Sequence, residues 1–207
     1  MNFGFLDLEM NCDGKIENEK FIDDRRMKRY QREIISVGFV VCDDKYKIKS
    51  RFSSFVKPVH NDIITDYCSA LTGITQENVN GGKKCNNAFG RLNEMCKRYS
   101  IDYIFVFGDF DKIGIISSIK WNKRYKEKSH HLYAVLKKVI DIKPIILKEI
   151  LKEINHKSCK KTPGLLKIAE NLKIECKVEH HNALSDANLL CEICKRLNIH
   201  SSRKLSL

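Results

Sequence analysis

Two carboxylates stand almost side by side in the first apolar segment of the chain. Asp7 and Glu9 are separated by one residue, and side chains two apart on a β-strand project from the same face. Such a pair repels and loses solvation, so a buried strand tolerates it only where a cation or hydrogen-bond donors compensate. Mg²⁺ and Mn²⁺ prefer carboxylate oxygens, and two such ions about 3.5–4 Å apart can stabilise both oxygens of a phosphodiester cleavage. The pair predicts either a metal site or a solvated strand end with two ordinary acids.

A second pair of acids follows another apolar run. Residues 103–107 predict a buried strand that ends at Gly108, and Asp109 and Asp111 come directly after it. Catalytic groups commonly lie where the carboxyl end of a strand gives way to a loop. Asp111 opens a segment that could be a helix, whereas Asp109 is equally well a turn residue or a helix cap.

A third acid, Asp186, lies on the inward stripe of a predicted helix near the end of the chain. Its neighbours on that face are Leu190 and Ile193, at helical spacing. His181 comes five residues earlier, so helix entry could bring the imidazole and the carboxylate into one pocket. A histidine with a pKa near neutrality can take a proton from water. The alternative for His181 is a helix-entry histidine without chemistry, and His180 is its easily confused neighbour.

In the type and order of these residues, the sequence resembles the DEDDh group of 3′–5′ exonucleases. The matching residues are Asp7-Leu8-Glu9, then Asp111, then His181 with Asp186 five positions later. The segment from Pro58 to Val79, with its run Leu71-Thr72-Gly73-Ile74-Thr75, also resembles the family. Among the subgroups, the Eri1-like and KapD-like exonucleases are the most similar, from Asn2 to about Leu197.

The resemblance implies a complete set of catalytic residues. Asp7, Glu9, Asp111 and Asp186 would hold two divalent ions, Mg²⁺ or Mn²⁺, and His181 would be the general base. The implied reaction is a two-metal-ion hydrolysis that releases nucleoside 5′-monophosphates from the 3′ end of RNA or single-stranded DNA.

The resemblance also chooses between the two acids after the second apolar run. Asp111 matches the aromatic-Asp step of the family, whereas Asp109 is an additional acid. Four further residues are candidates for substrate binding. Met10 and Phe110 could offer apolar surfaces to the terminal base, where stacking is worth roughly 1–3 kcal/mol, and Leu71 and Thr72 are pocket residues by resemblance. Ordinary packing is an equal alternative for all four.

Length and pattern predict one domain, residues 1–200, with a C-terminal tail at 201–207. The expected fold is α/β and RNase H-like, with a central mixed five-stranded sheet flanked by helices. Expected strands are 2–9, 33–42, 47–57 and 103–107, with a hairpin turn at Asp43 and Asp44. Expected helices are 62–71, 87–99 and 143–154, and one that Thr162 caps and Pro163 opens. The charged insert at 11–32 predicts a solvated loop, which could act as a lid.

The charge of the chain is compatible with a nucleic-acid partner. The net charge is +12 and the pI is near 9.2, the sign expected of a protein that meets phosphate backbones. Lysine clusters at 83–84, 120–128 and 157–161 are candidates for backbone contacts. A general bias of the source proteome toward lysine would also explain much of this excess.

The remaining features favour a cytoplasmic protein. The nine cysteines lack the spacing of a secreted scaffold, and no apolar run suggests a signal peptide or a membrane span. No protein partner can be named. Besides an active exonuclease, two other functions fit: a DNA proofreading or repair subunit that acts with a partner, and a nucleic-acid-binding protein whose catalysis is vestigial.

Overall fold

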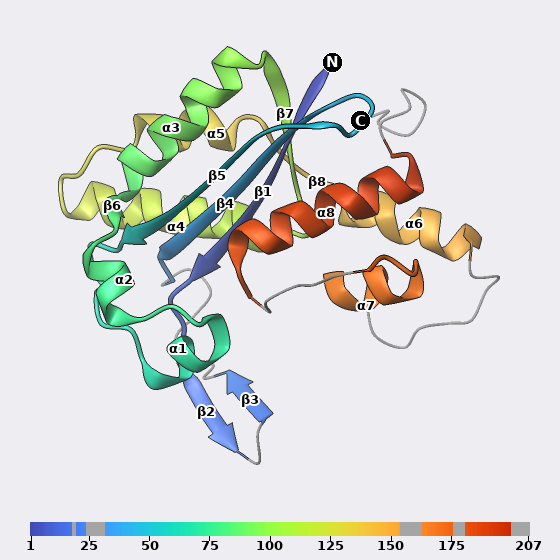
Figure 1. Cartoon of the computed structure of the whole chain (residues 1–207). Coiled ribbons are helices and arrows are strands. Elements are labelled where there is room, and N and C mark those ends of the chain that lie inside the picture. The colour runs from blue at the N-terminus through green and yellow to red at the C-terminus, as the bar shows by residue number, and fades with distance from the viewer. Residues whose placement is uncertain (18–19, 24–31, 154–162, 176–180, 200–207) are drawn as a thin grey trace.

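The core of the protein is a six-stranded mixed sheet with strand order β6-β5-β4-β1-β7-β8 (Figure 1). The computed structural model describes residues 1–17, 20–23, 32–153, 163–175 and 181–199. The strands of the sheet are β1 (Asn2–Met10), β4 (Ile34–Asp43), β5 (Ile48–Lys57), β6 (Lys83–Lys84), β7 (Ile101–Val106) and β8 (Val139–Asp141). β4 runs antiparallel to β1 and β5, and the other neighbouring strands pair in parallel.

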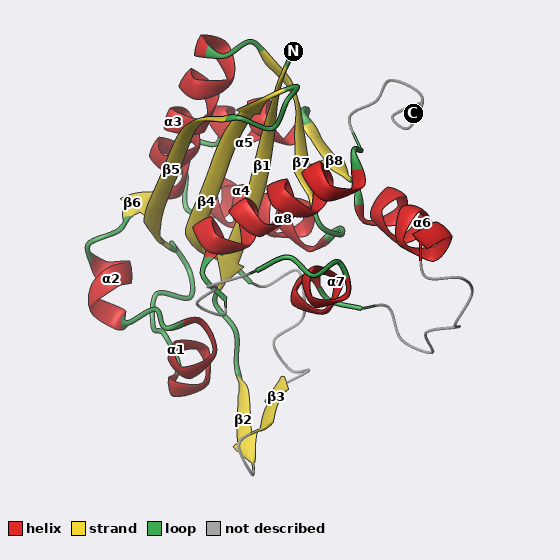
Figure 2. Ribbon diagram, turned by 45° about the vertical axis from the view of Figure 1, so that its right-hand side comes forward, coloured by secondary structure: helices red, strands yellow, loops and turns green. Residues whose placement is uncertain are grey.

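Helices cover both faces of the sheet (Figure 2). One face packs against α3 (Cys85–Arg98), α4 (Phe110–Arg124) and α5 (His130–Leu136). The other packs against α6 (Lys143–Glu153), α7 (Leu165–Asn171) and α8 (Ala183–Leu197). A sheet buried on both faces needs strands that are apolar on both sides, which explains the nearly continuous apolar run of β1.

The two faces of β1 differ at its carboxyl end. Leu6 and Leu8 point into the core under α3 and α4, whereas Phe3 and Phe5 point into the core under α8. With a period of two, the residues at positions 7 and 9 continue the Phe3 and Phe5 face. The strand therefore carries its apolar side chains under the middle of α8 and its acids near the start of that helix.

Two short helices lie beyond the carboxyl ends of β1 and β5. α1 (Asp66–Thr72) is capped by Thr65, whose hydroxyl accepts a 3.1 Å hydrogen bond from the Cys68 N–H, and it ends at Gly73 with φ 69°. α2 (Gln76–Asn80) has a capping box with Thr75. Their apolar residues form a small separate core, which places the segment after β5 beside the end of β1.

The structure confirms the expected fold class and corrects several elements. The sheet has six strands instead of five, because β6 and β8 are two and three residues long and too short to leave a periodic pattern. Part of the insert predicted to be a loop is a hairpin of β2 (Gly14–Glu17) and β3 (Lys20–Asp23). α1 begins at Asp66 and not near residue 62, because Thr65 caps it.

Other expectations have different outcomes. α7 begins at Leu165 after Gly164 at the N-cap position, and Thr162 lies outside the described residues. The turn at Asp43 is confirmed, since its carboxylate accepts hydrogen bonds from the Lys45 and Lys47 N–H groups. The tail at 201–207 and the lysines at 157–161 also lie outside the described part, and the single-domain boundary stays a prediction. None of the described helices has the length and apolar character needed to cross a membrane.

Candidate active site

The acidic pair of β1 lies where a second element approaches the sheet very closely. Asp7 pairs with Gly38 of β4, and directly opposite residues share one face. A Cβ atom at position 38 would overlap the backbone of Ala183 and Leu184, the first residues of α8. Glycine at position 38 thus lets the start of α8 rest directly on the sheet, beside Asp7 and Glu9.

Asp111 reaches the same place from the other side of β1. It lies in the first turn of α4, is 5% exposed, and accepts a 2.9 Å hydrogen bond from the Leu8 N–H through Oδ1. This bond ties α4 to the backbone between the two acids of β1. Asp109 occupies the N-cap position without a capping side-chain bond, and it does not line the cavity described below.

His181 and Asp186 come from the start of α8. Asn182 caps the helix by accepting a 3.2 Å hydrogen bond from the Ser185 N–H. His181 stands just before this cap, with φ 55° and an exposed side chain, and Asp186 lies in the first turn. One ligand atom each of Glu9, His181 and Asp186 lies within 4.8 Å of the other two. These three residues, 172 or more positions apart between strand and helix, therefore form one potential metal-binding group.

All nine residues predicted from the sequence line a single cavity of about 280 Å³. We call it the acidic cavity. Its lining residues are Asp7, Leu8, Glu9, Met10, Cys12, Arg32, Leu71, Thr72, Phe107, Phe110, Asp111, His181 and Asp186. The structure thus brings the proposed metal ligands, the histidine and the four candidate substrate contacts together, although their individual roles stay predictions.

Two of the candidate substrate-binding residues, Met10 and Thr72, also make contacts within the fold. Met10 is 6% exposed, and a Cβ atom at Gly114 would meet its sulfur at 2.5 Å, so its side chain rests on α4. The Thr72 hydroxyl donates a 2.8 Å hydrogen bond to the Cys68 carbonyl in α1. Both residues therefore support the wall of the cavity as well as lining it.

Burial and mutual repulsion raise the pKa values of carboxylates in the acidic cavity. The pKa of Asp7 is well above its usual value, first through burial and then through Asp111, Glu9 and Asp186. Burial and the charges of Asp186 and Asp111 raise the pKa of Glu9 to about 8. The pKa of Asp111 rises to about 7, chiefly through burial, although the bond from the Leu8 N–H opposes the shift. Bound cations would favour the charged form of these carboxylates, which suits the binding of hard divalent ions.

Four lining residues were not predicted as site residues, namely Cys12, Arg32, Phe107 and Leu8, the last of which lies between the two acids of β1. Arg32 is 9% exposed, and its guanidinium carbon lies 5.6 Å from the centre of the Phe110 ring. It is the single Lys or Arg among the described residues of this lining. Its place could have been inferred, because residues just before β4 must lie near the end of its antiparallel partner β1. Cys12 and Phe107 carried no comparable signal.

The comparison with known proteins agrees with this geometry. The family model described as exonuclease, RNase T, matches residues 5–112, about half of the chain. No curated protein matches the sequence significantly.

Several solved structures share the fold. A 3′-exonuclease in a structure of 3′-end specific recognition of histone mRNA stem-loop has a TM-score of 0.71 and 19% identity, over 95% of this chain and 63% of that one. The nuclease domain of 3′hExo, a DEDDh family member bound to rAMP, has a TM-score of 0.70 and 18% identity, over 95% and 90% of the two chains. E. coli exonuclease I in complex with a dA16 oligonucleotide has a TM-score of 0.63 and 12% identity, over 98% and 42%.

This chain spans less than two thirds of the length of the first of these proteins. At these identities the likeness of the structures shows the fold alone, and the Eri1-like subgroup stays a prediction from the sequence. The matched segment runs from β1 through Asp111 and so contains three of the four acids of the cavity. The chain belongs to the exonuclease family of the RNase T type.

Proposed function

We propose that this chain is a metal-dependent 3′–5′ exonuclease, which removes nucleoside 5′-monophosphates from the 3′ end of RNA or single-stranded DNA. The observation that carries the proposal is the convergence of four carboxylates and a histidine, from β1, α4 and the start of α8, in one cavity. The family membership supports nuclease activity. The direction of cleavage and the substrate are the further steps of the proposal.

The donor set fits a pair of hard divalent ions. Asp7, Glu9, Asp111 and Asp186 would hold Mg²⁺ or Mn²⁺, as their raised pKa values and shared cavity favour. Bound ions would supply Lewis-acid stabilisation of the negative charge on the phosphate oxygens. The carboxylate of Asp111 is already fixed by the Leu8 N–H, so this ligand is preorganised.

Side chains of the protein would transfer the proton and bind the substrate. His181 would accept the proton of the attacking water, as the new P–O bond forms and the bond to the 3′ oxygen of the preceding nucleotide breaks. Its exposed position before α8 gives it access to solvent and to the cavity together. Arg32 would face a phosphate oxygen, and Phe110 and Leu71 would offer apolar surface to the terminal base.

We propose both RNA and single-stranded DNA as substrates. The structures with the same fold hold a histone mRNA stem-loop, rAMP or a dA16 oligonucleotide, according to the protein. The resemblance to Eri1-like exonucleases favours RNA. A pocket that admits ribose discriminates against deoxyribose only where a protein group contacts the 2′-hydroxyl.

A time course on matched 5′-labelled RNA and DNA oligonucleotides tests the proposal. The wild-type chain should produce a ladder that shortens from the 3′ end with Mg²⁺ or Mn²⁺ and stops with EDTA. Asp7→Ala should abolish the ladder, whereas Asp109→Ala, which removes an acid outside the cavity, should keep it. A folded wild-type chain that binds both polymers but shortens neither with any metal would overturn the proposal and leave a binding protein.

A further inference from the structure

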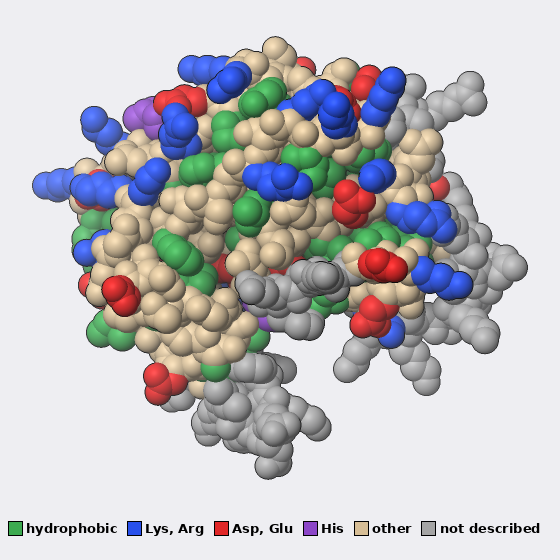
Figure 3. Space-filling model, in the orientation of Figure 1, with side chains coloured by type: hydrophobic (Ala, Val, Ile, Leu, Met, Phe, Trp, Pro, Cys, Tyr) green, Lys and Arg blue, Asp and Glu red, His purple; other side chains and the backbone are tan. Residues whose placement is uncertain are grey.

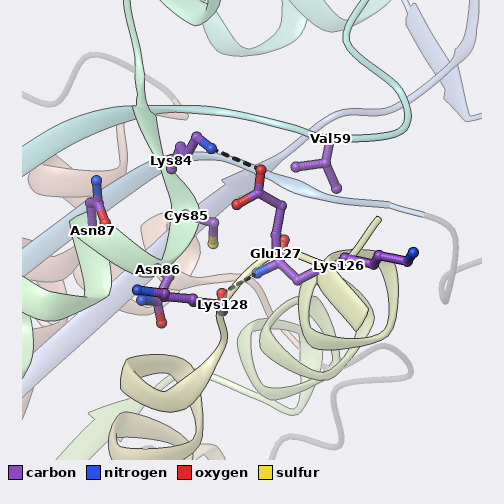
Figure 4. A pocket seen from close by; sticks show the side chains of 9 residues that line it. Val59, Lys84, Cys85, Asn86, Asn87, Lys126, Glu127 and Lys128 are labelled. Carbon is purple, nitrogen blue, oxygen red and sulfur yellow. Dashed lines mark hydrogen bonds and ion pairs between the residues drawn. The ribbon is translucent and has the colours of Figure 1, made fainter. Parts of the chain in front are cut away.

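A second pocket, of about 300 Å³, lies at the start of α3 (Figure 4). We call it the α3 pocket. Its lining residues are Val59, Lys84, Cys85, Asn86, Asn87, Asn122, Lys126, Glu127 and Lys128. They come from the segment after β5, from β6 and α3, and from the end of α4 with the loop after it. The acidic cavity shares none of these residues.

The pocket joins two lysine clusters that lie far apart in the sequence. Lys84 belongs to the cluster at 83–84, and Lys126 and Lys128 belong to the cluster at 120–128. Figure 3 shows Lys and Arg side chains projecting from this edge of the molecule, over β6 and the end of α4. The fold thus brings lysines of two separate sequence clusters to one concavity.

The charges of the pocket leave an excess of cations. Lys84 Nζ lies 2.8 Å from Oε1 of Glu127, so this pair neutralises the single acid of the lining. The Nζ atoms of Lys126 and Lys128 form neither ion pairs nor hydrogen bonds with the described part of the chain. In Figure 4 the Lys126 side chain extends away from Lys84 and Asn86. An anion would therefore meet one lysine in the pocket and another at its rim.

Asn86 adds an amide to the lining of the pocket. Its side chain is 7% exposed and lines the pocket, and its Oδ1 accepts a 3.0 Å hydrogen bond from the His131 N–H. That bond fixes the amide and leaves Nδ2, a donor, without a hydrogen bond to any described residue. This donor is accessible to solvent, so it can bind an acceptor, such as a phosphate oxygen, that enters the pocket.

The backbone of α3 adds donors of the same kind. This helix has 14 residues, its first turn contains no acid, and no side chain caps it. The first N–H groups of a helix have no intrahelical acceptor and carry the positive end of the helix dipole. With Asn86 Nδ2 and Lys128, they make a set of donors suited to a phosphate group.

A rigid connection links the α3 pocket to the acidic cavity. The carboxylate of Glu33, 2% exposed, accepts hydrogen bonds of 2.8 to 3.3 Å from the N–H groups of Val59, His60 and Asn61. Glu33 follows Arg32 of the acidic cavity, and Val59 lines the α3 pocket. One buried carboxylate thus holds the segment between the two sites.

Aromatic side chains accompany this segment. The rings of His60 and Trp121 stack with centroids 3.6 Å apart, and Tyr125, 47% exposed, accepts or donates a 2.8 Å hydrogen bond with His60. Tyr125 directly precedes Lys126. Lysines interleaved with an exposed aromatic ring are typical of a surface that follows a single strand.

We infer that the α3 pocket binds a backbone phosphate of the nucleic-acid strand whose 3′ end enters the acidic cavity. The inference rests on the proposed function and adds a second contact point, remote from the cleaved bond. Asn86, Lys128 and the first turn of α3 hold the phosphate, and Lys126 meets the next one along the strand. The site selects for strand length, because only a strand that spans both sites gains these contacts.

Binding measurements with two strand lengths test the inference. The probes are 5′-fluorescein oligonucleotides of about 12 and about 3 nucleotides, measured by anisotropy in EDTA over a series of KCl concentrations. For Lys126→Ala/Lys128→Ala, we expect about tenfold weaker binding of the long strand at low salt. The slope of log affinity against log salt should also become shallower by about 0.7 per lost contact. The short strand should lose less than about twofold.

The matched control is Lys45→Ala/Lys47→Ala, which removes the same charge from exposed positions at the opposite end of the sheet. Asn86→Asp, which keeps the acceptor for His131 and places a carboxylate oxygen in the pocket, should weaken long-strand binding further. Equal losses in the control and the pocket variant, or equal losses for both strand lengths, would overturn the inference. Such a result leaves the exonuclease proposal standing if the wild-type chain still shortens 3′ ends, so the two failures are distinguishable.

Discussion

The acidic cavity and the α3 pocket concentrate opposite charges at the same end of the sheet, where β1 and β5 end. The cavity gathers carboxylates whose pKa values are raised by burial and mutual repulsion, so bound cations would favour the approach of a phosphate. The α3 pocket offers lysines, an amide donor and the start of a helix, and these groups can contact a phosphate directly. On the two proposals above, the acidic cavity performs metal-dependent chemistry and the α3 pocket holds the strand.

The strongest test of this division is the loss of a proposed metal ligand. Asp186→Asn keeps the size of the side chain but removes a charge from the cavity, so we expect kcat to fall on the order of 10³-fold. Calorimetric titration should also show weaker Mn²⁺ binding. Asp109→Asn, two residues before Asp111, serves as the control and should change neither quantity. Unchanged Mn²⁺ binding in Asp186→Asn would remove this residue from the metal site.

A substitution in β4 should disturb the same cavity by displacing the start of α8. Gly38→Ala places a methyl group against the backbone of Ala183 and Leu184, and overpacking of this kind costs about 1–3 kcal/mol. The start of α8 must move, and it carries His181 and Asp186 with it. We expect a lower midpoint of urea unfolding together with reduced kcat and weaker metal binding.

The control for this variant is Gly81→Ala. The nearest atom to a Cβ there is 3.5 Å away, and φ is −80°, so alanine fits. If Gly38→Ala were destabilised but bound metal and cleaved at the wild-type rate, the close approach of α8 would matter for stability alone.

The link between the two sites should respond to Glu33→Gln. An amide keeps one acceptor oxygen but turns an NH₂ group toward backbone N–H groups that need an acceptor. We expect a loss of about 1–3 kcal/mol in the free energy of unfolding. If the segment at 59–61 positions the α3 pocket, affinity for long strands should fall more than affinity for short ones. A loss of equal size for both lengths would show that Glu33 stabilises the fold without aligning the two sites.

The site was easier to infer from the sequence than the path between the sites. Asp7 and Glu9 could be placed on one face because a period of two fixes them within a single strand. Asp186 and His181 could be assigned by family resemblance, but their approach to β1 depends on Gly38, a contact between residues about 145 positions apart. The α3 pocket could not be predicted, because it forms only when the two-residue strand β6 and the end of α4 come together. Local patterns carry no information about such contacts.

The metal-free protein should show the repulsion of the acidic cavity as a pH effect. The folded-state pKa of Glu9, about 8, lies above the ordinary value of a glutamate, so the folded state binds this proton more tightly than the unfolded state. The resulting stabilisation is complete below about pH 4 and disappears as pH rises toward 8. Thermal unfolding in EDTA should therefore shift to lower temperature between about pH 5 and pH 8.

Saturating Mg²⁺ or Mn²⁺ should abolish most of this shift, because the ions favour the charged carboxylates. Glu9→Gln should flatten the pH dependence in EDTA and raise the midpoint at pH 8, at the cost of metal binding. A stability profile that is the same with and without metal would contradict the assignment of these acids as ligands.

The smallest effect is expected at the opposite end of the sheet, where an acid serves structure alone. Asp43 accepts hydrogen bonds from the Lys45 and Lys47 N–H groups and lies 2.8 Å from Lys49 Nζ. These contacts, the one to Lys49 first, lower its pKa to about 2. Its contribution is therefore present above about pH 4 and is lost as pH falls toward 2, the reverse of Glu9. Asp43→Asn should reduce acid stability slightly and leave metal binding and cleavage unchanged. A change in metal binding or in cleavage would show that the charge of Asp43 influences the acidic cavity. The contrast between a structural acid at the turn and functional acids in the cavity would then be wrong.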